Sequence, residues 1–396
     1  MLQKEFEINF LTKTRIDKDS QNDDLIVLEP GFYYPIETIF IGKNSSGKST
    51  VLELIMIALE LLNDGRINKS HFEYGESFDV EVIFFVSGII YKYNGSFKND
   101  SLNNKAFLTI VDEALTKTTI KESYKKDLSN ASFFKAPDFK SNNDGDTSMI
   151  YRFSDDGSFN YSLESISDHP SNFKIFYKYL GEKVFNALLH LFDDSVDFIK
   201  PIEDDANLKD VYSIKRVNNE SVNVDVRTLK KVLSRGTIRG INLYALSIIT
   251  FISGGHLIVD EIESSFNRNL IENLLLMFND NTINKKGGTI IYSTHYSELL
   301  DIGSRCDNVN VLHREGTSIS LKNMHEHYDL RVEMLKSSQF NQNTFDTLIN
   351  YDRLMDLKDA IRQKEWWFYD CFSMRRNMRS AINAETSWKQ FFAIWY

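Results

Sequence analysis

The chain has 396 residues, 42% of them hydrophobic, and a formal net charge of −10 at pH 7. This size and apolar content predict a globular protein built as one large domain with an insertion or as two domains. The negative charge argues against non-specific binding of duplex DNA over the whole surface, although a local basic groove would be compatible with it.

Neither the cysteines nor the hydropathy indicates an exported or membrane-bound protein. Cys306 and Cys371 lie far apart and match no metal-binding or redox spacing, which is typical of a reducing compartment. The first six residues lack the basic and apolar plan of a secretory signal. The longest apolar stretch, residues 243–252, is well short of the roughly 20 residues needed to cross a bilayer. We therefore expect a cytoplasmic protein with no membrane partner.

Two short segments near the N-terminus have the pattern of strands. Residues 5–11 alternate polar and apolar side chains, and residues 25–28 are a run of Leu, Ile and Val after a polar loop. We expect both to belong to a sheet that precedes residues 42–50. The aromatic residues Phe32, Tyr33 and Tyr34 leave two interpretations open, a ring that stacks on adenine or packing at a strand end.

Residues 42–50 fit the phosphate-binding pattern G-x-x-x-x-G-K-[S/T]. A β-branched and aromatic run precedes them at 38–41, and apolar residues at helical spacing follow at 51–59, so the predicted context is strand, loop and helix. Inward-facing amides and the helix N-terminus would attract phosphate. Lys48 would reach the β and γ phosphates, and the Ser49 hydroxyl would bind Mg²⁺. The predicted binding residues are Gly42, Asn44, Ser45, Ser46, Gly47, Lys48, Ser49 and Thr50.

The middle of the chain predicts a second group of strands and an inserted region. Residues 78–86 and 89–93 flank Ser87-Gly88 as a hairpin, and residues 106–111 add another strand. Residues 113–172 are rich in polar residues and predict a loop or mobile insertion. Residues 173–192 predict an amphipathic helix, and residues 211–226 predict a hairpin.

Three segments that could take part in chemistry follow between residues 233 and 295. Residues 233–240 predict a small-residue turn that opens an apolar helix over 241–252. A buried strand at 257–261 ends in Asp260 and Glu261, a helix follows at 268–278, and a second buried strand at 289–292 ends near His295. In isolation, the acids would be a solvated strand-end pair and the histidine a core residue. Together with Lys48 and Mg²⁺ on Ser49 and Asp260, they supply what phosphoryl transfer to water requires.

Residues 35–60 and 230–315 resemble the ABC-type ATPase superfamily, in particular its OLD-like (overcoming lysogenization defect), SMC-related branch. That branch is similar to the ATPase subunits of the PARIS and Septu anti-phage systems. The resemblance implies an α/β fold, an ABC-type P-loop ATPase with a mixed central sheet, an N-terminal antiparallel β part and an inserted helical and hairpin arm. It also implies that Asp260 holds Mg²⁺ through water, Glu261 polarises the attacking water and His295 senses the γ phosphate.

The resemblance extends to residues that act between subunits. Residues 233–237 are similar to the family's signature motif, which implies a dimer with two ATP molecules between the subunits and contacts in trans from Ser234 and Gly236. Glu263, Ser264 and Ser265 resemble the loop that crosses the same interface, although Asn267 stands near the family's usual proline. No glutamine occurs between Gln21 and Gln339, so Ser87 or Asn94 would replace the family's loop glutamine, or metal and water are held differently.

The C-terminal part is predicted to be mostly helical over 313–363, with His325 and His327 in a solvated turn rather than a metal site. All four tryptophans fall within residues 366–396, which would form a small helical core or a docking surface.

From these patterns together we predict four segments in the chain: 1–112, the N-terminal core with the phosphate loop; 113–229, an inserted arm; 230–325, the C-terminal core; and 326–396, an aromatic-rich segment.

These features predict a Mg²⁺-dependent ATPase that hydrolyses ATP to ADP and phosphate. The resemblance implies a homo-oligomer with the ATP sandwich dimer as its unit. The resemblance implies a sensor or regulator of a separate nuclease or toxin in anti-phage defence, with DNA as a further candidate ligand. Two alternatives are an SMC-like DNA-repair or chromosome ATPase and the nucleotide-binding subunit of a transporter. The missing heptads count against the first, and the form of the signature motif counts against the second.

Overall fold

The computed structural model divides the chain into two compact units, Met1–Thr347 and Leu348–Tyr396. In the second unit, residues 351–362 form a helix. The structure describes residues 6–14, 16, 24–29, 31–71, 77–86, 88–99, 107–119, 134, 137–141, 145–150, 161–164, 169–202, 210–264, 267–303, 305–316, 318–329, 334–345 and 351–362.

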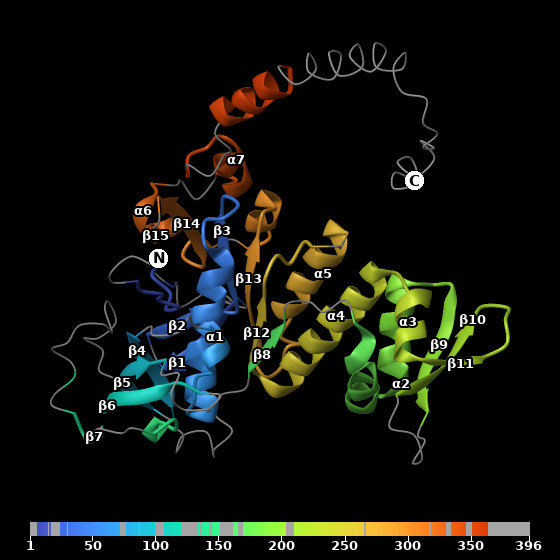
Figure 1. The fold of residues 1–396 in the computed structure, drawn as a ribbon, viewed down its shortest axis with the longest axis horizontal. Helices are drawn as coiled ribbons and strands as arrows, with labels where there is room; N and C mark the ends of the chain where they lie inside the picture. Colours follow the sequence, from blue (N-terminus) through green and yellow to red (C-terminus); the bar gives the residue numbers. More distant parts are fainter. Residues whose placement is uncertain are drawn as a thin grey trace, which may run out of the picture. The chain divides into compact units, whose positions relative to one another are not determined.

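A six-stranded mixed sheet lies at the centre of the first unit, in the order β15-β14-β3-β13-β12-β8 (Figure 1). All neighbouring strands are parallel except β14 and β15, so the prediction of a mixed sheet is confirmed. The strands are β3 (Glu37–Gly42), β8 (Tyr161–Glu164), β12 (His256–Val259), β13 (Thr289–Thr294), β14 (Val309–Glu315) and β15 (Ser318–Asn323).

The two faces of this sheet are covered by different helices, and side chains alternate between them. Phe40, Ile258 and Ile291 pack with α1 (Lys48–Asp64). Ile39 and Tyr292 pack on the other face with α2 (Phe173–Phe192), α4 (Arg235–Ser253) and α5 (Arg268–Phe278). Burial on both faces explains why these strands are apolar runs rather than alternating sequences.

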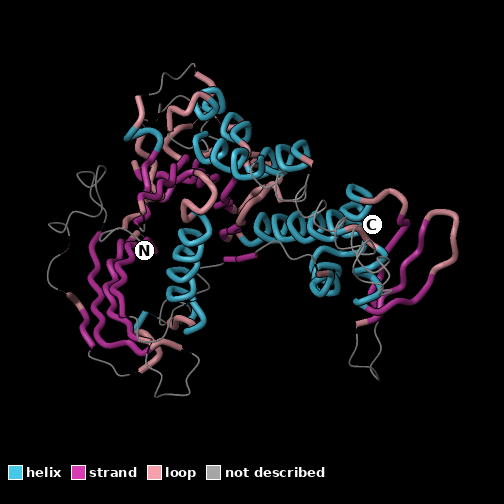
Figure 2. The backbone as a smooth tube through the Cα atoms, turned by 45° about the horizontal axis from the view of Figure 1, so that its top comes forward, coloured by secondary structure: helices cyan, strands magenta, loops and turns pink. Residues whose placement is uncertain are grey.

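The remaining strands of the described residues form three further sheets; Figure 2 draws strands in magenta. Neighbouring strands in these sheets are antiparallel. The C-terminal half of α1 packs on the four-stranded sheet through Ile57, Leu61 and Leu62. The strands are β1 (Leu25–Glu29) with β2 (Phe32–Pro35); β4 (Ser77–Val86), β5 (Ile89–Lys98), β6 (Thr109–Thr119) and β7 (Phe139–Ser141); and β9 (Val196–Ile202), β10 (Val211–Arg216) and β11 (Val222–Asp225). The remaining helices are α3 (Val226–Val232), α6 (Met324–His327), α7 (Lys336–Asn341) and the 3₁₀ turns η1 (Lys69–His71), η5 (Pro170–Asn172) and η6 (Ser297–Asp301).

Several predicted elements are confirmed. The strand at 25–28, the hairpins at 78–93 and 211–226, and the helix at 268–278 all form. Residues 173–192 are also helical, but the helix is kinked at Gly181, which has φ 79°. The third strand begins at Thr109 rather than at 106. Helix α4 is long and apolar enough to cross a bilayer by composition, but most of it is buried inside the protein, as in a core helix.

Two predictions in the N-terminal half are wrong. Residues 6–11 form no strand, because Phe6, Ile8 and Phe10 pack on the sheet core while their backbone pairs with no neighbouring strand. Residues 113–172 are not a continuous loop, since β6 runs to Thr119 and Tyr161–Glu164 pairs with β12 as an edge strand. Backbone pairing, rather than side-chain hydrophobicity, forms this edge strand.

Two predictions in the C-terminal half are also wrong. Residues 235–240 are helical rather than a turn, because Ser234 caps α4 by accepting a hydrogen bond from the Thr237 backbone at 3.0 Å. Residues 313–323 are not helical but belong to the hairpin β14–β15, because β14 pairs with β3 in the central sheet.

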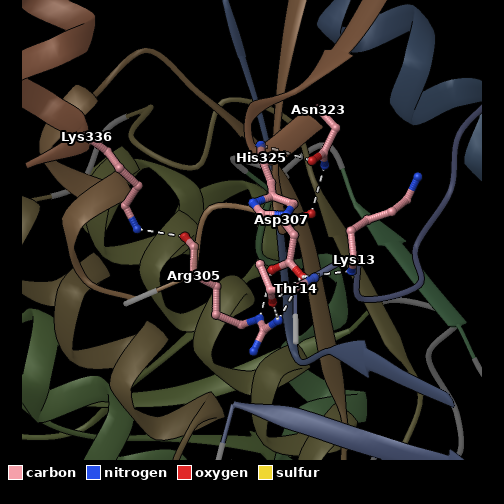
Figure 3. Close-up of polar contacts among 7 residues, drawn as sticks. All are labelled: Lys13, Thr14, Arg305, Asp307, Asn323, His325 and Lys336. Carbon is pink, nitrogen blue, oxygen red and sulfur yellow. Dashed lines mark hydrogen bonds and ion pairs between the residues drawn. The ribbon is translucent and has the colours of Figure 1, made fainter. Parts of the chain in front are cut away.

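Asp307, just before β14, fastens the N-terminal segment to the core (Figure 3). Its carboxylate accepts hydrogen bonds from the backbone of Lys13 and Thr14 at 2.9 and 3.0 Å and from Arg305 Nη2 at 2.7 Å. Nearby, Asn323 donates to the backbone carbonyl of Asp307 at 2.8 Å. Burial alone would raise the pKa of Asp307, but its bonds with Arg305 and Thr14 outweigh burial and hold that pKa below its usual range.

We expect Asp307→Ala to lower the free energy of unfolding by about 3–5 kcal/mol, because Arg305 is left without its buried partner. Urea unfolding at neutral pH measures this loss. The stability that Asp307 contributes is present above the unfolded-state pKa of about 4 and disappears as pH falls through the lower folded-state pKa. Asp210→Ala is the matched control, since Asp210 pairs with Lys174 at the surface and should cost at most about 1 kcal/mol. Equal losses for the two variants would contradict the assignment.

Candidate functional site

The parallel register brings three predicted motifs to one edge of the central sheet (Figure 1). Strand β13 lies between β3 and β12, with Thr294 opposite Ile41 and Tyr292 opposite Val259. Since parallel strands end at the same edge, the residues after β3, β12 and β13 converge there. This edge is where ligands bind in open α/β sheets.

The loop between β3 and α1 requires glycine at both of its motif positions. A Cβ at Gly42 would lie 2.6 Å from the Leu312 carbonyl oxygen, and one at Gly47 would lie 2.5 Å from Ile319 Cδ1. Gly47 also has φ 100°, and Ser45 has φ 64°, so two residues of the loop are left-handed. Helix α1 begins directly afterwards at Lys48, with Ser49 and Thr50 exposed in its first turn. The loop therefore has the curled backbone and helix start that suit a phosphate.

Lys48 lies almost buried over this loop, with 6% of the residue exposed. Its ammonium group donates to the carbonyl oxygens of Gly42 and Lys43 at 3.0 and 3.1 Å. Burial lowers its pKa, while the carboxylates of Asp260, Glu263 and Glu261 act in the opposite direction. The structure thus places the predicted lysine and the predicted acids in one electrostatic environment.

Ser293 contacts both acidic residues that follow β12, through the Asp260 carboxylate and the Glu261 backbone. Its hydroxyl donates to Asp260 Oδ1 at 2.5 Å and accepts from the Glu261 backbone at 2.8 Å. Glu261 has φ 49°, and its side chain is 56% exposed, with Oε1 4.0 Å from His295 Nε2. Asp260 is thereby fixed against the sheet, whereas Glu261 and His295 face an accessible space. The bridging role of Ser293 was not predicted, since it depends on the register of β12 against β13.

Glu263 connects the loop after β12 to the segment after β13. Its Oε1 accepts a hydrogen bond from the His295 backbone at 2.6 Å, and its Oε2 is buried without a partner among the described residues. The resemblance had placed Glu263 in a loop that crosses between subunits. Within one protomer, its carboxylate fixes the backbone of the predicted phosphate-sensing histidine.

The signature residues lie at the start of α4. The Ser234 hydroxyl accepts from the Thr237 backbone and lies 2.9 Å from Thr237 Oγ1, while Gly236 is in the first helical turn. Within the described part of one protomer, neither residue is hydrogen-bonded to residues 42–50. Their predicted contact with ATP in trans stays a prediction.

The donor set fits Mg²⁺. The predicted protein ligands, Ser49 and Asp260, offer a hydroxyl and a carboxylate oxygen, the ligand types that Mg²⁺ takes. No group of three or more His, Cys, Asp and Glu side chains occurs in the described part of the chain. Mg²⁺ is commonly held by one or two protein oxygens, with water and substrate phosphates as the other ligands. When bound, the ion neutralises charge on the phosphate oxygens.

Other predicted residues lie elsewhere. Phe32 is buried in a small apolar cluster, and the Tyr34 ring lies 6.4 Å from the His256 ring, so both pack against neighbouring side chains. Burial raises the pKa of Tyr34 to about 12. Asn94 is in the middle of β5, in the four-stranded sheet. Ser87, Ser265 and residues 366–396 lie outside the described residues.

Comparison with known families decides the class of this site. The family described as "AAA domain, putative AbiEii toxin, Type IV TA system" matches residues 38–301, which include the phosphate loop, Asp260, Glu261 and His295. The chain belongs to this family of AAA-type ATPase domains. The match confirms the prediction that the chain contains a nucleotide-binding P-loop ATPase domain. No curated protein matches the chain at a significant level.

Proposed function

We propose that this AAA-domain protein is a Mg²⁺-dependent ATPase that closes as a homodimer around ATP and controls a separate nuclease or toxin in anti-phage defence. The observation that carries the enzymatic part is the convergence of Lys48, Asp260, Glu261 and His295 at one sheet edge. We place the protein in the cytoplasm.

In this proposal, each residue of the edge has one role in phosphoryl transfer. Lys48 exchanges its loop carbonyl partners for phosphate oxygens, and Ser49 and Asp260 hold Mg²⁺. Glu261 accepts a hydrogen bond from the attacking water and orients it. His295 donates to the γ phosphate, and Glu263 keeps its backbone in place.

The dimer is supported by the start of α4. Ser234 is exposed at the helix N-terminus, where the first backbone N–H groups have no intrahelical acceptor. A γ phosphate bound to a second protomer would meet both those groups and the favourable end of the helix dipole. One protomer therefore provides the phosphate loop, and its partner completes the site.

Sedimentation analysis of Glu261→Gln tests the dimer, because slow hydrolysis should accumulate the closed state. We expect a dimer with Mg²⁺ and ATP, and a monomer with ADP. Adding Ser234→Arg should abolish ATP-dependent dimerisation while ATP binding persists. Ser221→Arg is the matched control, since Ser221 is exposed at the β10–β11 turn. A monomer in saturating Mg²⁺ and ATP would contradict the proposal.

The defence role is supported by the family description, which names a putative toxin of a type IV toxin–antitoxin system. The same description favours a second candidate, in which this chain itself is the toxic component. Expressing the chain alone, with its neighbouring genes and as Lys48→Ala separates them. Toxicity of the chain alone supports the second candidate, whereas phage resistance that requires both a neighbouring gene and Lys48 supports the first.

A further inference from the structure

The hairpin β14–β15 is the direct support of the phosphate loop, and we propose that Arg314 is the positioning residue through which it controls nucleotide affinity. This inference rests on the proposed ATP-binding function. Arg314 lies on β14, in a segment whose sequence had predicted a helix, so no motif pointed to it. The hairpin brings it to the loop across 269 residues of chain.

Three contacts join the hairpin to the loop. Leu312 is in register with Gly42, and its carbonyl oxygen occupies the space that a Cβ at Gly42 would need. Ile319 lies in the same way against Gly47. Arg314, the cross-strand partner of Ile319, donates from Nη1 to the Ser45 carbonyl oxygen at 3.1 Å. The cross-strand pair Arg314 and Ile319 therefore contacts the loop at Ser45 and at Gly47.

The bond from Arg314 acts on the orientation of a single peptide group. In a trans peptide, the carbonyl and the following N–H point in opposite directions. Because Arg314 holds the Ser45 carbonyl toward the hairpin, the Ser46 N–H is turned the other way, into the loop. There it donates to the Lys43 carbonyl oxygen at 3.1 Å, the same oxygen that accepts from Lys48. Arg314 thus fixes the peptide group whose amide closes the loop onto the Lys43 carbonyl, the oxygen that also holds Lys48.

The guanidinium group suits this position because it holds two carbonyls at once. Nε donates to the Gly316 carbonyl oxygen at 3.2 Å while Nη1 donates to Ser45, so the planar fork ties the loop to the hairpin's own turn. A lysine ammonium is a point donor at the end of a flexible chain and cannot reproduce this fork. Ser45 has φ 64°, a conformation that non-glycine residues rarely adopt, and the fork stabilises it.

Binding of a fluorescent ATP analogue and steady-state hydrolysis by the full-length protein test the inference. We expect Arg314→Ala to weaken analogue binding and raise KM by about tenfold, the loss associated with one hydrogen bond to a charged group. The value of kcat should be unchanged, because Arg314 is not assigned a contact with the reacting atoms. Arg314→Lys should recover part of the affinity.

Lys322→Ala provides the matched control, since it removes one exposed cation from β15 of the same hairpin. It should leave the dissociation constant and KM unchanged. The inference is overturned if Arg314→Ala binds like the wild type, if it lowers only kcat, or if Lys322→Ala has the same effect. If Arg314→Ala does not fold, the affinity of Arg314→Lys is the test: an affinity below that of the wild type supports the inference, and an affinity equal to it overturns the inference. Failure of the wild type itself to bind the analogue would reject the proposed function instead.

Discussion

Replacement of Lys48 by alanine should abolish ATP binding at micromolar protein concentrations. The Lys48 ammonium group is held over the loop by two carbonyl oxygens, and it is the nearly buried cation at the phosphate-binding edge. In the ATP complex, these two hydrogen bonds would go to phosphate oxygens. Their loss, at about 1.5–3 kcal/mol each, corresponds to roughly 10²- to 10⁴-fold weaker binding of ATP. Isothermal titration calorimetry with ATP and Mg²⁺ measures the change.

Lys43→Ala is the control for this prediction. It removes a cation from the same loop but keeps the Lys43 carbonyl that accepts hydrogen bonds from Lys48 and Ser46. Its affinity should stay much closer to that of the wild type. A Lys48→Ala protein that is folded and binds ATP as the wild type does would remove the basis of the proposed function.

Glu261→Gln should bind ATP normally but hydrolyse it on the order of 10³- to 10⁵-fold more slowly, the range seen when one group that stabilises phosphoryl transfer is lost. The Glu261 carboxylate is exposed near His295, on the side of the site that a water can reach. Glutamine keeps the size of the side chain but has no charge and cannot accept a proton. Phosphate release and analogue binding should be measured on the same preparation.

Glu272→Gln is the matched control because Glu272 pairs with Arg268 on the exposed side of α5. It should hydrolyse ATP at the wild-type rate. If Glu261→Gln also turned over at that rate, Glu261 would not be the group that orients water. The site would then have to use another carboxylate, and Glu263, which accepts a hydrogen bond from the His295 backbone, is an alternative.

The sequence by itself was sufficient for the local elements. The loop at 42–50 depends on glycines that adopt left-handed or crowded positions and on the helix that follows, so the pattern is contained within a few residues. Helix α5 was also predicted within its observed bounds, because its apolar spacing and its capping residue Asn267 are local. The family match places these motifs in an AAA-type ATPase domain.

Only the tertiary structure decided the strands that form by pairing rather than by hydrophobic pattern. Tyr161–Glu164 is polar in part and became an edge strand through β12, and the polar end of β14, residues 313–315, became a strand by pairing with the edge strand β15. A backbone hydrogen-bond ladder imposes little on the side chains of an edge strand, so its sequence carries a weak signal.

The same reason explains which contacts of the site were not predicted. Ser293, Glu263 and Arg314 act through partners 32, 32 and 269 positions away in the chain, respectively. Asp307 reaches Thr14 across 293 positions. Such contacts exist only once the chain has folded. At the sheet edge, the register of the parallel strands sets which residues face each other. The sequence determined the chemistry of the phosphate loop and the acids, and the fold determined what holds them in place.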